Sequence, residues 1–395
     1  MKKLKVTMIV TGFPTPDNPS HGVFNERAAG LLADYVDLTV LQLRVWKPGR
    51  KFVSFEPDKL YKHYTVSVPH LPFGNHNILC ILLRLFKMVI YRNLNDPLCE
   101  TDVFHSVGAS FSGALGAGLA IRFNKTHVMQ LIGTDINTEL PDLLNKSCFK
   151  VLKEKTDGVG CNSQELKYNY ERLFGKTENI EVIYRGIDTQ KYDYSFNCLG
   201  DGSLRFLFLG GIPFYKHVES GRNLKGGLDL MKAWESKERM FNENNCKLIF
   251  AGPDSDSEFA KNWRKSLKYP DNVILKGILP PDKVMDEYKD CHVVLIPSLE
   301  EGMPNVALEA GSTGKCLIAS GVGGLPELIE NGKTGLLVAP GNSAELAEGM
   351  TKLILNPGMI KEMGLKLREN IITNFEAKVF PQKYFDLYKK SMECN

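Results

Sequence analysis

The residues of this sequence that could do chemistry include two carboxylates, Glu301 and Glu309, eight positions apart. Eight positions are about two turns of an α-helix, so both side chains can project from the same side of it. The apolar residues 292–296 precede them and are typical of a buried parallel strand, and Pro304 suits the first turn of a following helix. The pattern therefore predicts a strand, a turn and a helix with two carboxylates near its start.

The start of this predicted helix is also a candidate binding site for an anion. Met303, Asn305 and Val306 supply backbone N–H groups at the positive end of the helix, at the carboxyl edge of a sheet. A carboxylate repels a bound phosphate, so we expect the glutamates to bind hydroxyl groups instead. The alternative for each glutamate taken singly is a place on a solvated helix face.

The segment EGMPNVALE, from Glu301 to Glu309, resembles the E-x7-E motif of retaining, nucleotide-sugar-dependent glycosyltransferases of the GT-B fold. The resemblance implies that Glu301 lies against the donor sugar and that Glu309 binds the ribose hydroxyls. It also implies that the helix start, with Gly302, Met303, Asn305 and Val306, holds the diphosphate. Transfer with retained anomeric configuration is expected, with no metal ion and no cofactor.

Lys225, in the segment LKGGL, resembles the lysine that follows the first strand of the donor domain in this family. It is therefore the expected partner of the diphosphate and a candidate catalytic residue. A lysine at a helix start is unfavourable against the helix dipole unless an anion binds there, whereas a surface lysine is the plainer alternative. The family usually has an arginine directly after that strand, where this sequence has Gly211. Either Arg222 or Lys216, in the long loop that follows, could replace it.

Four further residues are expected at the site because of the resemblance. Gly22 ends a Pro- and Gly-rich loop that should close on the donor phosphates, and Ile278 should lie against the nucleobase. Asp135, in IGTDIN, is expected to contact donor or acceptor hydroxyls, although Ile132 occupies the position of the usual histidine. Arg185, in IYRGID, replaces the usual asparagine and could meet the diphosphate.

Alternating strand and helix patterns predict an α/β protein with two Rossmann-like domains, whose parallel sheets face each other across a cleft. The expected first domain, on the acceptor side, spans residues 1–190, and a polar linker spans 191–203. The donor domain is expected at 204–374. Residues 375–395 should form a helix that packs back on the first domain.

Composition excludes several classes of protein. The 49 basic and 46 acidic residues give a formal net charge of +3, too small for the basic stripe that nucleic acid requires. Nine scattered cysteines form no C-x-x-C pair, which favours a reducing, cytoplasmic compartment over a disulfide framework or a zinc site. The basic start of the chain, with Lys2, Lys3 and Lys5, resembles a signal peptide but its apolar run is too short. The pair Asp254 and Asp256 is interpreted as turn chemistry rather than a metal site.

One predicted amphipathic helix bears on whether the acceptor of the sugar is lipid-linked. Residues 76–92 combine a long apolar face with Arg84 and Lys87, and such a helix could make peripheral contact with an anionic membrane if the acceptor is lipid-linked. The favoured alternative is a core helix with a solvated stripe. His105, near the end of a predicted strand, is similarly expected to be a buried structural histidine.

The predicted function is transfer of a sugar, with a UDP-sugar favoured, to a glycan or lipid-linked acceptor in polysaccharide or glycoconjugate synthesis. Two alternatives stay open: a nucleotide-sugar epimerase on the same fold, and a non-catalytic nucleotide-sugar-binding protein. A Rossmann oxidoreductase would need G-x-G-x-x-G after the first strand, and the sequence TGFPTP there is not that motif.

Overall fold

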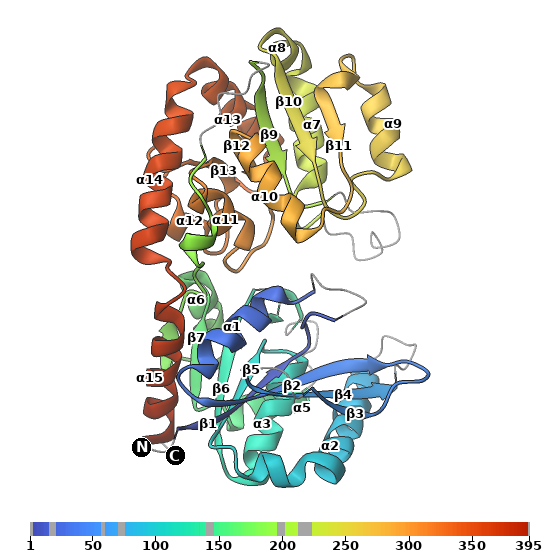
Figure 1. Ribbon diagram of the computed structural model, residues 1–395, viewed down its shortest axis with the longest axis vertical. Helices are drawn as coiled ribbons and strands as arrows, with labels where there is room; N and C mark the ends of the chain where they lie inside the picture. The colour runs from blue at the N-terminus through green and yellow to red at the C-terminus, as the bar shows by residue number, and fades with distance from the viewer. Residues whose placement is uncertain are drawn as a thin grey trace. The chain divides into compact units, whose positions relative to one another are not determined.

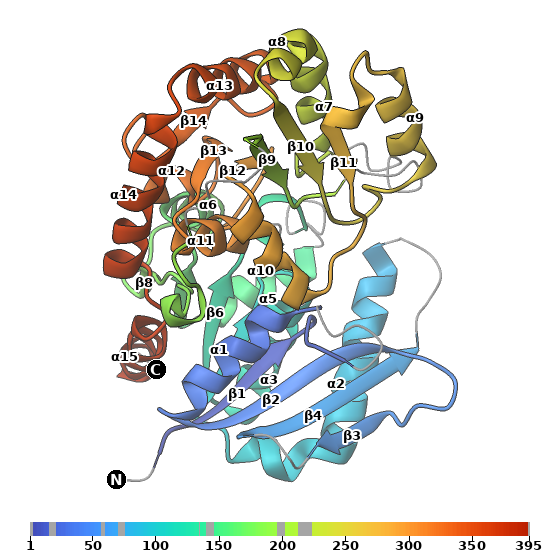
Figure 2. The same ribbon diagram turned by 45° about the horizontal axis from the view of Figure 1, so that its top comes forward.

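The chain folds into two compact units, Met1–Arg185 with Lys378–Asn395, and Gly186–Ala377. Each is an α/β unit built on its own sheet, which confirms the predicted fold class (Figures 1 and 2). The computed structural model describes residues 3–15, 21–56, 60–69, 76–133, 135–139, 146–195, 202–211 and 223–393.

Unit 1 contains an eight-stranded sheet in the order β3-β4-β2-β1-β5-β6-β7-β8. Every neighbouring pair is parallel except β3 and β4, which are antiparallel at one edge. The strands are β1 Lys5–Val10, β2 Asp37–Trp46, β3 Val53–Glu56, β4 Lys62–Pro69, β5 Val103–Val107, β6 Thr126–Leu131, β7 Gly158–Cys161 and β8 Ile180–Val182. Because the strand order changes direction between β1 and β5, their carboxyl ends mark the switch point of this unit.

Helices cover both faces of this sheet, as a parallel sheet requires. One apolar cluster joins β1 and β2 to α1 and α15, and a second joins β2, β4 and β5 to α2 and α3. The helices of unit 1 are α1 Val23–Ala33, α2 His76–Cys99, α3 Phe111–Phe123, the π-helix η1 Asp135–Glu139, α5 Lys146–Glu154, α6 Gln164–Phe174 and α15 Val379–Glu393. Ser163 caps α6, since its Oγ accepts a hydrogen bond from the N–H of Leu166 at 3.3 Å.

The second half of α2 is a core helix. Its buried residues Phe86, Ile90, Leu94 and Leu98 recur every fourth position and pack into the cluster with α3. Lys87 lies over Gly118 of α3, where a Cβ atom would fall 2.5 Å from its Nζ. The described side chains therefore favour the core-helix alternative; the side chain of Arg84 lies outside the described residues. No helix within the described residues has the length and hydropathy that a membrane span needs.

The last helix, α15, belongs to unit 1 although it follows unit 2 in the chain. It lies beside β6 and β7, and the hydroxyl of Tyr388 is 2.6 Å from Nδ1 of His105 on β5. Tyr384 stacks on the same imidazole at a centroid distance of 4.7 Å. His105 is thus a buried structural residue, as expected.

Unit 2 contains a six-stranded, fully parallel sheet in the order β11-β10-β9-β12-β13-β14. This is the doubly wound Rossmann order, with the switch point between β9 and β12. Its strands are β9 Leu204–Phe208, β10 Cys246–Phe250, β11 Val273–Leu275, β12 Val293–Ile296, β13 Cys316–Ser320 and β14 Leu336–Val338. A ligand of this unit is therefore expected at the carboxyl ends of β9 and β12.

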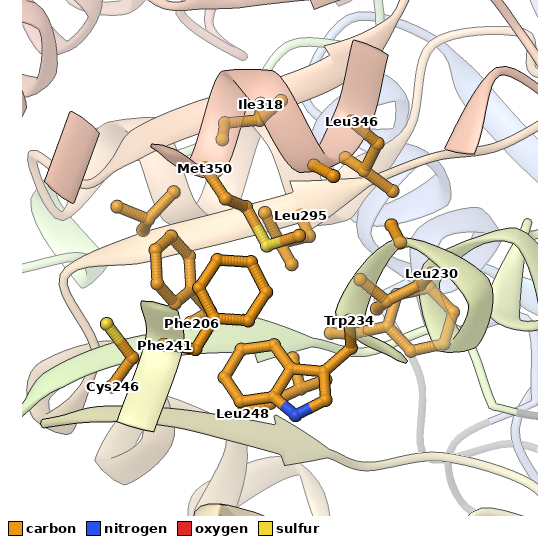
Figure 3. Packing of buried hydrophobic residues seen from close by; sticks show 14 of the residues in the cluster. Phe206, Leu230, Trp234, Phe241, Cys246, Leu248, Leu295, Ile318, Leu346 and Met350 are labelled. Atoms are coloured by element: carbon orange, nitrogen blue, oxygen red, sulfur yellow. The ribbon is translucent and has the colours of Figure 1, made fainter. Parts of the chain in front are cut away.

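The core of unit 2 lies between its sheet and the helices α7 and α13. Figure 3 shows Trp234 of α7, Phe206 and Leu248 of the sheet, and Met350 of α13 in this core. The helices of unit 2 are α7 Gly227–Ser236, α8 Glu238–Glu243, α9 Glu258–Ser266, α10 Pro281–Asp290, α11 Asn305–Ser312, α12 Leu325–Leu328, α13 Ser343–Leu355 and α14 Gly358–Asn374, with the 3-10 turns η2 Thr189–Lys191 and η4 Pro270–Asn272. On the opposite face, Gly311 of α11 meets α14 so closely that a Cβ would overlap the side chain of Ile371.

The chain passes from unit 1 to unit 2 after Arg185 and returns after Ala377. This passage lies before the expected linker, 191–203. Residues 187–195 are instead hydrogen-bonded within unit 2. The N–H of Ile187 donates to the carbonyl of Phe375 at 2.8 Å, and the N–H of Ala377 donates back to Ile187 at 3.0 Å. Lys315 Nζ then donates to the carbonyl of Ser195 at 2.6 Å.

Candidate functional site

The loops that follow β9 and β12 meet at the switch point of unit 2. The N–H of Leu299, after β12, donates to the carbonyl of Leu224, after β9, at 2.8 Å. Gly226 has φ 74°, in the left-handed region, and lies so close to Pro297 that a Cβ would overlap the proline carbonyl. Only glycine fits this position, and the residue beside it is Lys225.

Lys225 and Glu301, which the sequence places 76 positions apart, form an ion pair in this junction. Lys225 Nζ lies 2.7 Å from Oε1 of Glu301, and the hydroxyl of Ser298 donates to the same oxygen at 2.7 Å. The Glu301 side chain is 9% exposed and the Lys225 side chain is 51% exposed. The ammonium group is therefore accessible to a ligand, while the carboxylate that orients it is mostly covered.

The turn VGGLPE, residues 322–327, packs against the backbone of the loop that carries Glu301. The N–H of Gly324 donates to the carbonyl of Gly302 at 2.6 Å. Gly323 has φ 58°, and a Cβ there would overlap the carbonyl oxygen of Glu301. Met303 packs against Gly324 and is nearly buried. These close backbone contacts fix the path of the chain from Glu301 into α11.

Helix α11 begins at Asn305, with Pro304 as its N-cap rather than in its first turn as predicted. Asn305 is exposed and Val306 half-buried, and their N–H groups lie in the first turn, where no intrahelical carbonyl reaches them. The positive end of α11 thus points out of the same loop that carries Glu301. The arrangement can bind an anion beside the Lys225 ammonium group.

Glu309, about one turn into α11, is held by two tyrosines. The hydroxyl of Tyr192 donates to its Oε1 at 3.1 Å, and the hydroxyl of Tyr288 donates to its Oε2 at 3.0 Å. Burial, and then the charge of Glu309, raise the pKa of Tyr288 well above its usual value, so this phenol stays protonated and can donate. Sequence reasoning missed both tyrosines, because nothing in their local sequence distinguishes them.

Gly211 stands where the family usually has an arginine, and its surroundings exclude any side chain. Its φ is 72°, and a Cβ would overlap the carbonyl oxygen of Pro253. The candidates for its replacement, Arg222 and Lys216, lie outside the described residues. Ile278, expected against the nucleobase, follows β11 and is 73% exposed.

The expected site residues of unit 1 lie near its own switch point. Gly22 is the N-cap of α1 with φ 71°, and a Cβ would overlap the backbone of Gly12 and Phe13. Arg185 packs its guanidinium over the Phe24 ring, 4.3 Å from the centroid, and donates to Oδ1 of Asn25 at 3.2 Å. These contacts hold Arg185 at the start of α1.

Asp135, expected to contact sugar hydroxyls, makes contacts with the backbone of two loops. Its buried carboxylate accepts hydrogen bonds from the N–H groups of Ala109 at 2.7 Å, Gly133 at 2.7 Å and Ile132 at 3.1 Å. Three amides on one carboxylate tie the loop after β5 to the loop after β6. Asp135 therefore shapes these loops, and its contact with a sugar hydroxyl stays a prediction.

The aspartates of the D-x-D sequence behave as turn residues. Asp254 has φ 59°, a conformation that aspartate tolerates in turns, and the Asp256 carboxylate packs against Gly277. Among the described residues, no group of three or more His, Cys, Asp or Glu side chains is placed to hold a metal ion.

Comparison with known proteins identifies the unit that carries this site. Residues 212–377 match the family described as Glycosyl transferases group 1. This part of the chain is similar to the group 1 glycosyltransferases, and we call it the group 1 domain. An uncharacterized glycosyltransferase of Methanocaldococcus jannaschii is 26% identical over 251 residues. That match covers 58% of this chain and 59% of the relative, so it spans little more than half of either protein.

Solved structures share the fold of the group 1 domain and of the rest of the chain. Sucrose-phosphate synthase from Thermosynechococcus elongatus matches with a TM-score of 0.74 and 18% identity, over 100% of both chains. Anabaena HepE in complex with UDP-glucose matches with a TM-score of 0.68 and 16% identity, over 97% of this chain and 98% of that one. These matches confirm the predicted GT-B fold.

Proposed function

We propose that this protein transfers a sugar from a nucleotide diphosphate sugar, with a UDP-sugar favoured, to a glycan or lipid-linked acceptor with retention of configuration. The observation that carries the proposal is the Lys225–Glu301 pair beside the start of α11, at the switch point of the group 1 domain. The binding of UDP-glucose by HepE, a protein of the same fold, supports the choice of donor.

In the proposed reaction the acceptor oxygen forms a bond to the anomeric carbon while the bond from that carbon to the diphosphate oxygen breaks. The acceptor proton passes to the leaving phosphate, so no protein base takes part. Negative charge grows on the diphosphate as the bond breaks, and Lys225 and the positive end of α11 stabilise it. Glu301 orients Lys225 and lies against the donor sugar, and Glu309 binds the ribose.

The proposed acceptor does not depend on a membrane contact through α2. Phe86, Ile90, Leu94 and Leu98 turn one face of α2 to the core, and Lys87 lies against α3.

Five cysteines of the described residues are free, which supports the proposed cytoplasmic, reducing compartment: Cys99, Cys161, Cys246, Cys291 and Cys316.

The proposal is tested by incubating the protein with UDP-sugars and candidate glycan acceptors, and by reading the anomeric configuration of the product by NMR. We expect an α-linked product from an α-linked donor. An epimerase would change the donor sugar without any acceptor, and a non-catalytic protein would bind the donor without turnover. Either result would reject the transfer reaction.

The assignment of Glu309 gives a separate prediction. Glu309→Ala should weaken the binding of UDP by about 1–3 kcal/mol, because a hydrogen-bond acceptor of the ribose is lost. Calorimetric titration of the wild-type protein and the variant measures the difference. Glu309→Gln keeps the size of the side chain and separates lost recognition from a disturbed fold. Equal affinity of all three proteins for UDP would reject the ribose contact.

A further inference from the structure

The carboxylate of Glu309 is oriented on both sides by phenols that come from different parts of unit 2. Tyr288 lies in α10, and Tyr192 follows the 3-10 turn at the start of this unit. Their hydroxyls reach Oε2 and Oε1, at 3.0 Å and 3.1 Å. One phenol on each oxygen fixes the plane of the carboxylate.

Both phenols are themselves held in place. Tyr288 is completely buried, and Tyr192 is nearly so. Arg368 of α14 donates from Nη1 to the backbone carbonyl of Tyr192 at 3.0 Å, which anchors the segment that carries this ring. Glu309 itself is only partly buried. The rings are therefore rigid supports for a side chain that the fold does not fully enclose.

We propose that Tyr192 and Tyr288 are positioning residues that set how strongly this site recognises the ribose hydroxyls of a nucleoside diphosphate. The inference rests on the proposed function, in which Glu309 binds the ribose. A glutamate without these supports would exchange among several rotamers, and its hydrogen bonds to two neighbouring hydroxyls would lose their geometry. The tyrosines therefore act on ribose through Glu309 and touch no reacting atom.

A purely structural role for the same contacts predicts something different. Glu309 would then only tie α10 and the Tyr192 segment to α11, and loss of a phenol would loosen the site as a whole. The binding of every nucleotide would fall by the same factor, whether or not the nucleotide has ribose hydroxyls. Discrimination between ribose and dideoxyribose therefore separates the two roles.

The test is a calorimetric titration of UDP and 2′,3′-dideoxy-UDP into the wild type, Tyr192→Phe and Tyr288→Phe. We expect the wild type to prefer UDP, and we expect the preference to fall by about threefold to tenfold in each variant, the factor for one lost hydrogen bond. Affinity for the dideoxy nucleotide should stay unchanged. Tyr194→Phe, two positions from Tyr192 in the same segment, is the matched control and should keep the full preference.

Parallel loss of affinity for both nucleotides would overturn the inference and leave the proposed function standing. An unchanged preference in both Phe variants would overturn it as well. A wild-type protein that binds UDP no better than dideoxy-UDP would reject the ribose contact of Glu309, and the inference with it. Thermal unfolding of each variant shows whether it is folded before it is titrated.

Discussion

Lys225→Ala is expected to lower turnover about a hundredfold or more, while the apparent KM for the donor changes much less. The reason is that the diphosphate gains negative charge in the transition state, so a cation placed beside it acts more strongly there than on the bound donor. Steady-state kinetics with a saturating acceptor measures both constants for the wild type and the variant.

Two further variants separate the loss of the positive charge from the loss of a hydrogen bond to Glu301. Lys225→Arg keeps a positive charge next to Glu301 and should recover part of the turnover. Ser298→Ala removes the other hydrogen bond to Oε1 of Glu301 but keeps the ammonium, so its effect should be small. If Lys225→Ala raises only the KM for the donor, the lysine is a ground-state contact and its catalytic role is wrong.

Acid is expected to destabilise unit 1 through two buried histidines. Burial, together with the nearby His127 and Arg185, lowers the pKa of His105 to about 3. Burial lowers the pKa of His127 to about 4, although its contact with the carbonyl of Lys155 raises it in part. Nδ1 of His127 lies 2.9 Å from that carbonyl, so the ring is a neutral donor there, and its Nε2 can accept from Ser106.

The sign of the effect follows from these depressed values. Unfolded imidazoles bind protons near pH 6.5 and the folded ones do not, so stability is lost as the pH falls from about 6.5 towards 4. Each imidazole should contribute up to about 1.4 kcal/mol per pH unit, and the two together about 3–4 kcal/mol between pH 7 and pH 5.

Urea unfolding at pH 7 and at pH 5 measures this loss. His127→Gln, which has one titratable group fewer, should lose about half as much stability as the wild type over the same range. NMR of the wild-type imidazole protons gives an independent check, because neither ring should titrate between pH 7 and pH 5. A midpoint near pH 6.5 for either buried ring would contradict the prediction.

Sequence patterns predicted the regular elements well where apolar residues face the core. The segments FSGALGAGLAIRF and QELKYNYERLF predict helices at residues 111–123 and 164–174, and both helices occur with those bounds. The strands β3 and β4 were not predicted, although the apolar residues Tyr64, Val66 and Val68 of β4 alternate with polar residues in the manner of a strand. The polar residues between them are buried, and the hydroxyl of Thr65 donates to Oε1 of Gln42 at 3.2 Å.

The residues of the candidate site were predictable where they belong to a sequence motif. They were not predictable where only tertiary contacts bring them to the site. The spacing of Glu301 and Glu309 and the segment around Lys225 are visible in the sequence. The tyrosines on Glu309 lie 117 and 21 positions away from it, and no periodicity relates them. The backbone contacts of Asp135 were not predictable either. In a sequence, an aspartate that accepts from backbone amides looks the same as one that binds a sugar.

We propose above all that the group 1 domain binds a nucleotide diphosphate sugar with Lys225, the start of α11 and Glu309. Calorimetric titration of the wild-type protein with UDP-glucose, UDP-galactose, ADP-glucose and GDP-mannose tests it most directly. We predict saturable binding of at least one UDP-sugar with one site per chain, weakened in both Lys225→Ala and Glu309→Ala. Failure of all four donors to bind, or binding that both variants retain at full strength, would contradict the account.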